Sequence, residues 1–218
     1  MARFPTGTTT PRRVGLASAT SPAAKLIFVL LFGAFWNGIV SLFLVDIVAS
    51  FRGDSSPDWF GALFMVPFVA VGAGAILYFF YTLLSLFNPR PHLSVSANPV
   101  RLDDRLEVDW TTTGSVDRIR AWRITLEGRE AATYTRGTTT STDTETFAEF
   151  DVAKGSGGAG FREGGGKVVF PANAMHSFNG GNNRIAWVLK VHGDIPFWPD
   201  VNEEFEIEVT PRRAGGPA

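Results

Sequence analysis

The sequence has no cysteine and few histidines among its 218 residues. The first absence excludes disulfide bonds, thiolate nucleophiles and cysteine-ligated zinc. The three histidines, His92, His176 and His192, match none of the spacings that mark a metal site. His176 precedes Ser177, but adjacent strand residues point to opposite faces and do not form a nucleophile and base. We predict no metal, no cofactor and no enzymatic activity; an enzyme site between His176, His192 and the Trp198–Asp200 turn is disfavoured.

Charged residues are scarce as well. They make up 19% of the chain, whereas soluble globular chains have about 25%. The formal net charge is −1 and no basic domain stands out, so nucleic acid is not predicted as a partner. Phenylalanine, in contrast, occurs 19 times. Part of the chain is therefore expected to face the lipid bilayer.

The first long hydrophobic run lies between Lys25 and Asp46 and holds twenty uncharged residues. A helix rises about 1.5 Å per residue, so this run crosses a hydrocarbon core about 30 Å thick. We predict a transmembrane helix over about residues 26–48. A cleaved signal peptide is the alternative, but its apolar core is typically about 7 to 15 residues, and here a second hydrophobic run follows closely.

The second run, Trp59–Phe87, has no charge over 29 residues and predicts a second span over 59–87. The two spans form a predicted hairpin over residues 25–88. Orientation follows from counting basic residues in the short flanks. Four precede the first span, one lies in the connecting loop and three follow soon after the second span; they are Arg3, Arg12, Arg13, Lys25, then Arg52, then Arg90, Arg101 and Arg105. This count predicts a multi-pass membrane protein with both termini cytoplasmic.

Three segments lack any hydrophobic period. Residues 1–24 and 212–218 are rich in small residues and proline, so we predict a disordered cytoplasmic tail at the N-terminus and a disordered tail at the C-terminus. The glycine-rich stretch Lys154–Lys167 predicts a flexible loop, because glycine loses the most entropy on ordering. It lacks the Gly-Lys-Ser/Thr of a phosphate-binding loop.

Beyond Pro91 the apolar residues alternate with polar ones, which is typical of strands. Seven stretches carry this alternation: 92–97, 105–110, 122–127, 150–152, 168–170, 184–191 and 204–209. Turn residues separate them. We predict an antiparallel two-sheet β-sandwich over 91–211, and the fold class is a membrane α-helical hairpin followed by an all-β domain.

One polar residue, Asn37, lies in the middle of the first span. Its amide needs a partner within lipid, and we predict a hydrogen bond to the second helix in preference to a substrate pathway, since one uncharged group is too little for transport. Small residues in the second span let another helix approach closely. They are Ala70, Gly72, Ala73 and Gly74. The approaching helix belongs either to the same hairpin or to a partner.

The segment VVFPANAMHSFNGGNNRIAWVLKV, Val168–Val191, resembles part of the arrestin-like (immunoglobulin-like) sandwich domains. In those domains a strand ends at proline, a link leads to Pro-Ser-Phe-x-Gly, and an alternating strand follows. The matching residues here are Pro171, Ser177, Phe178 and Gly180, while His176 stands where proline is usual. The resemblance covers about 91–211, and the whole layout is similar to small bacterial membrane proteins of unassigned function with two spans before such a domain. The resemblance implies an adaptor or scaffold.

Together with the resemblance, these observations give a primary hypothesis of a non-enzymatic binding or scaffolding module held at the cytoplasmic face of the plasma (bacterial inner) membrane. The alternative is an accessory subunit of a larger membrane transport or secretion assembly. For the module, we predict a partner contact at one loop end of the sandwich, formed by the His176–Asn183 link and the Gly193–Asn202 turn. Its aromatic residues are Phe178, Phe197 and Trp198. The competing interpretation is that Phe197 and Trp198 plug the core or dip into the lipid interface.

Overall fold

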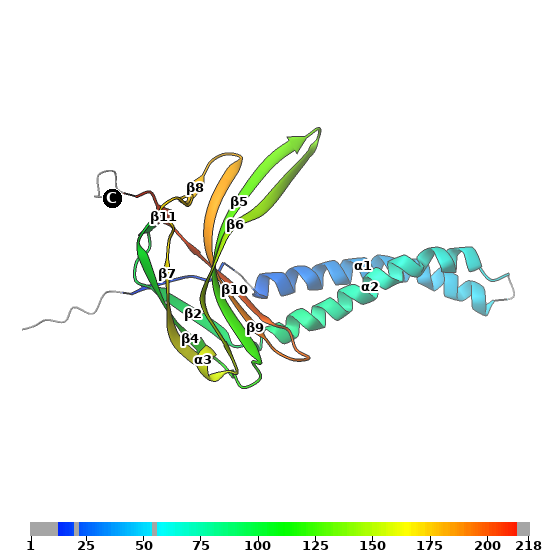
Figure 1. Cartoon of the computed structure of the whole chain (residues 1–218). Coiled ribbons are helices and arrows are strands. Elements are labelled where there is room, and N and C mark those ends of the chain that lie inside the picture. The colour runs from blue at the N-terminus through cyan, green and yellow to red at the C-terminus, as the bar shows by residue number, and fades with distance from the viewer. Residues whose placement is uncertain (1–12, 20–21, 54–55, 213–218) are drawn as a thin grey trace, which may run out of the picture. The chain divides into compact units, whose positions relative to one another are not determined.

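The computed structural model describes residues 13–19, 22–53 and 56–212 (Figure 1). Residues 22–88 form one compact unit, and residues 13–19 together with 89–212 form another. Most of the two predicted tails, residues 1–12 and 213–218, lies outside the described residues.

The helical unit consists of α1 (Pro22–Arg52) and α2 (Trp59–Ser85). Both helices are long and apolar enough to cross a membrane. The helix α1 begins earlier than predicted, because proline is well suited to a first helical turn that needs no amide donor. The helix α2 ends at Ser85 instead of residue 87, since Pro89 disfavours helical geometry in the residue before it. At its other end, Asp58 caps α2 by accepting a hydrogen bond from the Gly61 amide at 2.8 Å.

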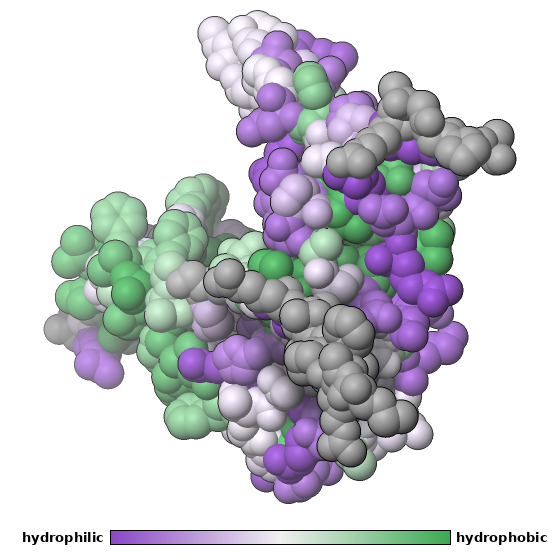
Figure 2. Space-filling model, turned by 90° about the vertical axis from the view of Figure 1, so that its left-hand side faces the viewer, coloured by the Kyte–Doolittle hydropathy of each residue, from purple (hydrophilic) through white to green (hydrophobic). Residues whose placement is uncertain are grey.

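The helices expose most of their apolar side chains. Only 11% of the most hydrophobic stretch of each helix is buried, whereas the core helix of a water-soluble protein is mostly buried. Phe28, Leu42, Phe60 and Leu77 are each about 70–80% exposed. Figure 2 shows the hydrophobic surface of the helices and the mainly hydrophilic surface of the β-rich unit. An apolar surface of this extent calls for an apolar cover.

The β-rich unit is a two-sheet sandwich. One sheet has the order β1-β2-β4-β7, the other has the order β10-β9-β5-β6 with β8 beside β9, and β3 pairs with β11 in parallel. All other pairings within the sheets are antiparallel. The strands are β1 (Val14–Gly15), β2 (Arg90–Val95), β3 (Val100–Arg101), β4 (Arg105–Thr113), β5 (Ala121–Arg136), β6 (Thr139–Ser156), β7 (Glu163–Val169), β8 (Phe178–Asn179), β9 (Asn183–Asp194), β10 (Val201–Ile207) and β11 (Val209–Thr210), with a short helix α3 (Ala159–Arg162) between β6 and β7.

A single hydrophobic core joins the two sheets. Alternate residues of β2, β4 and β10 point inward, as the period of two requires. Among the fully buried side chains are Val95, Leu106, Val108, Ile124, Leu126, Phe170, Trp187, Leu189 and Phe205. The predicted antiparallel sandwich is therefore present, and its seven predicted strands correspond to β2, β4, β5, β6, β7, β9 and β10. The four strands that the sequence did not predict are only two residues long, too short for an alternation to be visible.

The first correction concerns the predicted N-terminal tail. Residues 13–19 belong to the sandwich: β1 pairs with β2, and Ser18 forms a β-bridge with Phe205 of β10. The Leu16 amide donates to the Leu93 carbonyl at 2.9 Å, and the Ala19 amide donates to the Glu204 carbonyl at 2.8 Å. The segment thus supplies hydrogen-bond partners to strand edges of both sheets, which exposed edges otherwise lack.

The second correction concerns Lys154–Lys167, which is ordered within β6, α3 and β7. Its glycines leave room for two tryptophan rings. A Cβ atom at Gly155 would lie 2.8 Å from the ring of Trp122, and one at Gly164 would overlap the ring of Trp110. The glycine composition therefore reflects close packing, and the tryptophans that require it lie far away in the sequence.

We predict that Gly158→Ala destabilises the sandwich by about 1–3 kcal/mol, the usual cost of overpacking. A Cβ atom there would overlap the backbone carbonyl of Val116, which a side-chain rotation cannot relieve. The measurement is thermal unfolding of the full chain in detergent. Gly181→Ala is the matched control, because nothing lies within 4 Å of a Cβ atom at Gly181. Equal unfolding midpoints for the two variants would contradict the packing argument.

Candidate functional site

The predicted helix contact at Asn37 is present. Its Nδ2 donates to the Gly33 carbonyl of its own helix at 2.8 Å and to the Gly72 carbonyl of α2 at 3.3 Å. Gly72 is buried, and a Cβ atom there would overlap Asn37 Oδ1. Among the four small residues noted in α2, Gly72 alone is buried, and Ala70, Ala73 and Gly74 are exposed. The glycine is therefore needed for the close approach of the asparagine.

A second interhelical hydrogen bond was not predicted. Trp36 Nε1 donates to the Phe68 carbonyl at 3.0 Å, and the two rings lie 6.2 Å apart in a stacked arrangement. The position of Trp36 next to Asn37 in the sequence is the signal for it, because both side chains carry an N–H that is costly to leave unpaired in lipid.

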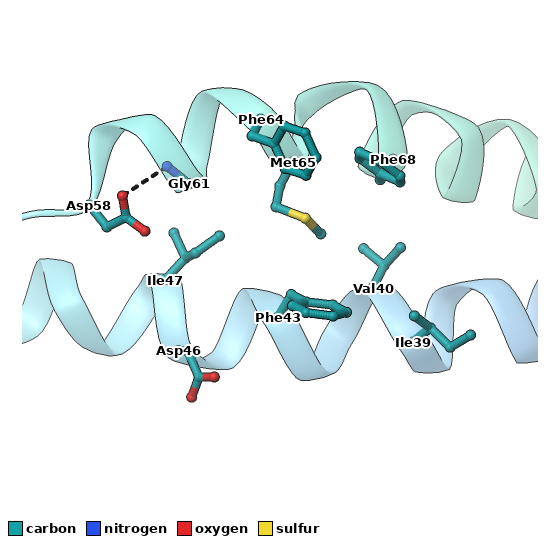
Figure 3. Close-up of a pocket in the computed structure, with 10 residues that line it drawn as sticks. All are labelled: Ile39, Val40, Phe43, Asp46, Ile47, Asp58, Gly61, Phe64, Met65 and Phe68. Atoms are coloured by element: carbon teal, nitrogen blue, oxygen red, sulfur yellow. Dashed lines mark hydrogen bonds between the residues drawn. The ribbon is translucent and has the colours of Figure 1, made fainter.

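A cavity of about 380 Å³ lies between α1 and α2 near the loop that joins them. Figure 3 shows Phe64 and Met65 of α2 and Val40, Phe43 and Ile47 of α1 around this space. The carboxylate of Asp46 points away from α2 in the same view, and that of Asp58 caps the helix. The cavity is thus an apolar gap that suits a hydrocarbon chain or a bulky side chain and offers no catalytic arrangement.

Phe178 lies in β8, where it pairs with Ile185 at the start of β9. Its side chain is 50% exposed. Ser177 fixes the link before it, because its amide donates to the Val209 carbonyl at 2.8 Å and its hydroxyl accepts from the Val209 amide at 2.9 Å. Phe178 is therefore a half-exposed aromatic residue on an ordered segment.

Phe197 and Trp198 lie in the turn between β9 and β10. Phe197 is fully exposed, whereas Trp198 packs against the hydrophobic core and lies under the guanidinium of Arg118, 5.5 Å from the ring centroid. The interpretation that both aromatics plug the core thus holds for Trp198 alone.

The predicted shared loop end is wrong. Phe178 lies beside the first residues of β9, and the Phe197 turn follows the last, so the whole strand separates them. β9 has 12 residues, and a strand rises about 3.3 Å per residue, so the two segments lie on the order of 30 Å or more apart. For the same reason His176 lies far from His192, and the disfavoured enzyme site is not assembled. Among the described residues no group of three His, Asp or Glu side chains is placed to hold a metal ion.

The outer face of the β9 and β10 sheet carries a charge cluster that the sequence did not reveal. Arg129 Nη2 lies 2.6 Å from Glu127 Oε2 and 2.7 Å from Glu204 Oε1, and Lys190 Nζ lies 3.4 Å from Glu127 Oε1. The hydrogen bonds from Arg129 outweigh desolvation and hold the pKa of Glu204 below its usual value. The hydrogen bonds that Arg129 donates to Glu204 and Glu127 likewise raise the pKa of Arg129. Because Glu127 and Glu204 both pair with Arg129, we interpret the cluster as an ion-pair network with a structural role.

No protein-family model and no curated protein sequence matches the chain. Among solved structures the chain is similar to that of Spo0M, a sporulation control protein from Bacillus subtilis. The sequence identity is 12%, the TM-score is 0.41, and the match covers 57% of this chain and 50% of that one. The chain thus matches half the length of that structure, and a likeness of this degree carries no functional conclusion.

Proposed function

We propose that the protein is a membrane-anchored binding or scaffolding module, in which a helical hairpin holds an arrestin-like β-sandwich at the cytoplasmic face. The observation that carries the proposal is the outward-facing apolar surface of α1 and α2, which only an apolar medium or apolar partners can cover. The pattern of Val168–Val191 supports the adaptor role by resemblance. The charge count in the flanks supports the cytoplasmic side.

The pairing of β1 with β2 supports the hairpin topology independently of charge. β1 precedes α1 and β2 follows α2, yet the two strands share one sheet. Residues on the two sides of the hairpin must therefore lie on the same side of any membrane that the hairpin crosses. This is the arrangement expected when both helices span the bilayer and both termini lie on one side of it.

The topology is tested with reporter fusions. A reporter active only in the cytoplasm should be active after Ala218 and silent when inserted between Gly53 and Asp58, because the flanking basic residues favour the inside for both ends of the hairpin. The opposite pattern would reverse the orientation. Activity at both positions would mean that the hairpin does not cross the membrane, and the anchored module would then be abandoned.

The alternative function is that of an accessory subunit whose helices pack within a larger membrane assembly. Gly74 is exposed on α2, nothing lies within 4 Å of the position that a Cβ atom would take there, and it offers a close approach to a further helix. Gentle detergent extraction of the full chain, with identification of the proteins that co-purify, distinguishes the two proposed functions. If the complex is lost in Gly74→Leu, the result favours the accessory subunit. If the complex is kept in Gly74→Leu and lost in Phe178→Ala, the result favours the binding module.

A further inference from the structure

The turn between β9 and β10 holds Phe197 away from the protein. Its exposed fraction is 106%, the highest among the large hydrophobic side chains of the described residues, and its φ is +58°, a left-handed conformation that is uncommon for a bulky residue. The turn is not loose: the Trp198 amide donates to the Ile195 carbonyl at 3.1 Å, and the Ile195 amide donates to Asp200 Oδ1 at 3.0 Å. A strained backbone thus presents an apolar ring outside the core, which points to a function.

The pairing of the strands places this turn at the end of the sandwich where the chain enters from α2. Arg90, the first residue of β2, pairs with Thr113 at the end of β4. The loop from β4 then leads to Arg120, whose amide donates to the carbonyl of Asp194, the last residue of β9, at 2.9 Å. α3 lies at the same end, between the last residue of β6 and the first of β7 (Figure 1).

The tether between the units is short. α2 ends at Ser85 and β2 begins at Arg90. Even when fully extended, a chain of this length spans only about 17 Å. If α2 ends at the membrane surface, Arg90, which lies at the same end of the sandwich as the Phe197 turn, is within about 17 Å of that surface.

The surroundings of the turn suit an interface. Arg118 stacks over Trp198, and Arg90 and Arg162 are exposed at the same end of the sandwich. Guanidinium groups pair well with phosphate, and aromatic rings favour the level of the headgroups. Acidic residues are present there too, among them Asp117, Glu163, Asp194 and Asp200, so the apolar ring, and not a net positive charge, supplies the attraction.

We propose that Phe197 inserts into the lipid interface and holds this end of the sandwich against the membrane that anchors the chain. The inference rests on the proposed membrane anchor. A phospholipid surface is favoured over a protein partner because the short tether leaves the bilayer within reach of this end of the sandwich whether or not another protein is present.

The test places a benzophenone amino acid at position 197 of the full chain reconstituted in phospholipid vesicles, followed by irradiation and detection of lipid adducts. The residue is fully exposed, so the substitution does not disturb the core. Position 178 is the matched control, an exposed phenylalanine at the other end of β9. Position 42, a side chain of α1 that is 70% exposed, reports whether the hairpin itself is in lipid.

We expect lipid adducts at 42 and 197, with those at 197 several-fold above those at 178. Adducts at 42 together with equal, background yields at 197 and 178 would overturn the inference and leave the anchor intact. Absence of adducts at 42 would overturn the anchor and the inference with it. In native membranes, an adduct at 197 to a protein in place of lipid would assign the turn to a protein partner and would also overturn the inference.

Discussion

Replacing Trp187 with alanine is expected to lower the free energy of unfolding by about 3–5 kcal/mol, the range for truncation of a large buried aromatic residue. The side chain is fully buried, and its ring lies 5.1 Å from Phe170 and 5.5 Å from Phe147 in edge-to-face arrangements. Its Nε1 donates to the Met175 carbonyl at 2.8 Å. The substitution removes the ring contacts and leaves that carbonyl without its donor, and domains are stable by only about 5–15 kcal/mol in total.

The measurement is chemical or thermal unfolding of the full chain in detergent, with near-ultraviolet circular dichroism as the signal that reports unfolding. Phe178→Ala is the control for loss of an aromatic ring that is half exposed, and we expect a far smaller change there. Trp187→Phe should fall between the two, because it keeps most of the packing and loses the hydrogen bond. Equal midpoints for Trp187→Ala and Phe178→Ala would show that the core does not depend on this ring.

The second large effect is expected for Arg129→Ala, at about 2–4 kcal/mol, somewhat below the cost of breaking a fully buried ion pair. The side chain of Glu127 is only 10% exposed, whereas those of Arg129 and Glu204 are 22% and 34% exposed. Removal of the arginine leaves both carboxylates with Lys190 as the remaining cation. Arg184→Ala is the matched control, because it breaks a pair with Glu206 at 2.6 Å in which both side chains are 52% exposed. Such exposed pairs contribute about 0–1 kcal/mol.

The pair of Arg129 and Glu204 also predicts that the stability of the protein depends on pH. Because the hydrogen bonds from Arg129 lower the pKa of Glu204, the folded protein binds this proton less readily than the unfolded chain does. The stability that the pair contributes is fully present above the usual glutamate pKa of about 4.5 and is lost as the pH falls through the lowered value. Arg129→Ala should therefore lose less stability than the unmodified protein between neutral and acidic pH. An unchanged slope of stability against pH would contradict the pairing.

The elements that could be predicted are those whose signal is local. Runs of uncharged residues predicted α1 and α2, alternation predicted the seven longer strands, and the single amide of Asn37 predicted a contact between the helices. The predicted helix bounds were less accurate, although local chemistry explains the observed ones, since Pro22 begins α1 and Pro89 prevents α2 from continuing. The membrane setting, the cytoplasmic side and the scaffolding role stay predictions.

The elements that could not be predicted depend on distant partners. Val14 and Gly15 have no pattern of their own and form a strand only because β2 offers an edge on the far side of the hairpin. The glycines of residues 154–167 predict a flexible loop, because the local sequence does not show that Trp110 and Trp122 pack against them. The shared loop end was a different error. One alternating strand joins the Phe178 link to the Phe197 turn, and a strand separates the segments at its two ends, so the sequence itself argued against that surface.

The pairing of β1 with β2 also has a thermodynamic consequence. Formation of this pair closes a loop that contains both helices, and loop closure costs entropy that grows with loop length, by about 0.6 kcal/mol for each doubling. In the antiparallel hairpin, Lys25 lies over the ring of Tyr78, so the first turn of α1 and the last turns of α2 are already close together. A formed hairpin therefore shortens the free loop several-fold and reduces the cost of docking β1 by about 1–2 kcal/mol. Docking of β1 on the sandwich is therefore coupled to assembly of the two helices. In a chain whose hairpin has not formed, we expect the pairing of β1 with β2 to be less stable.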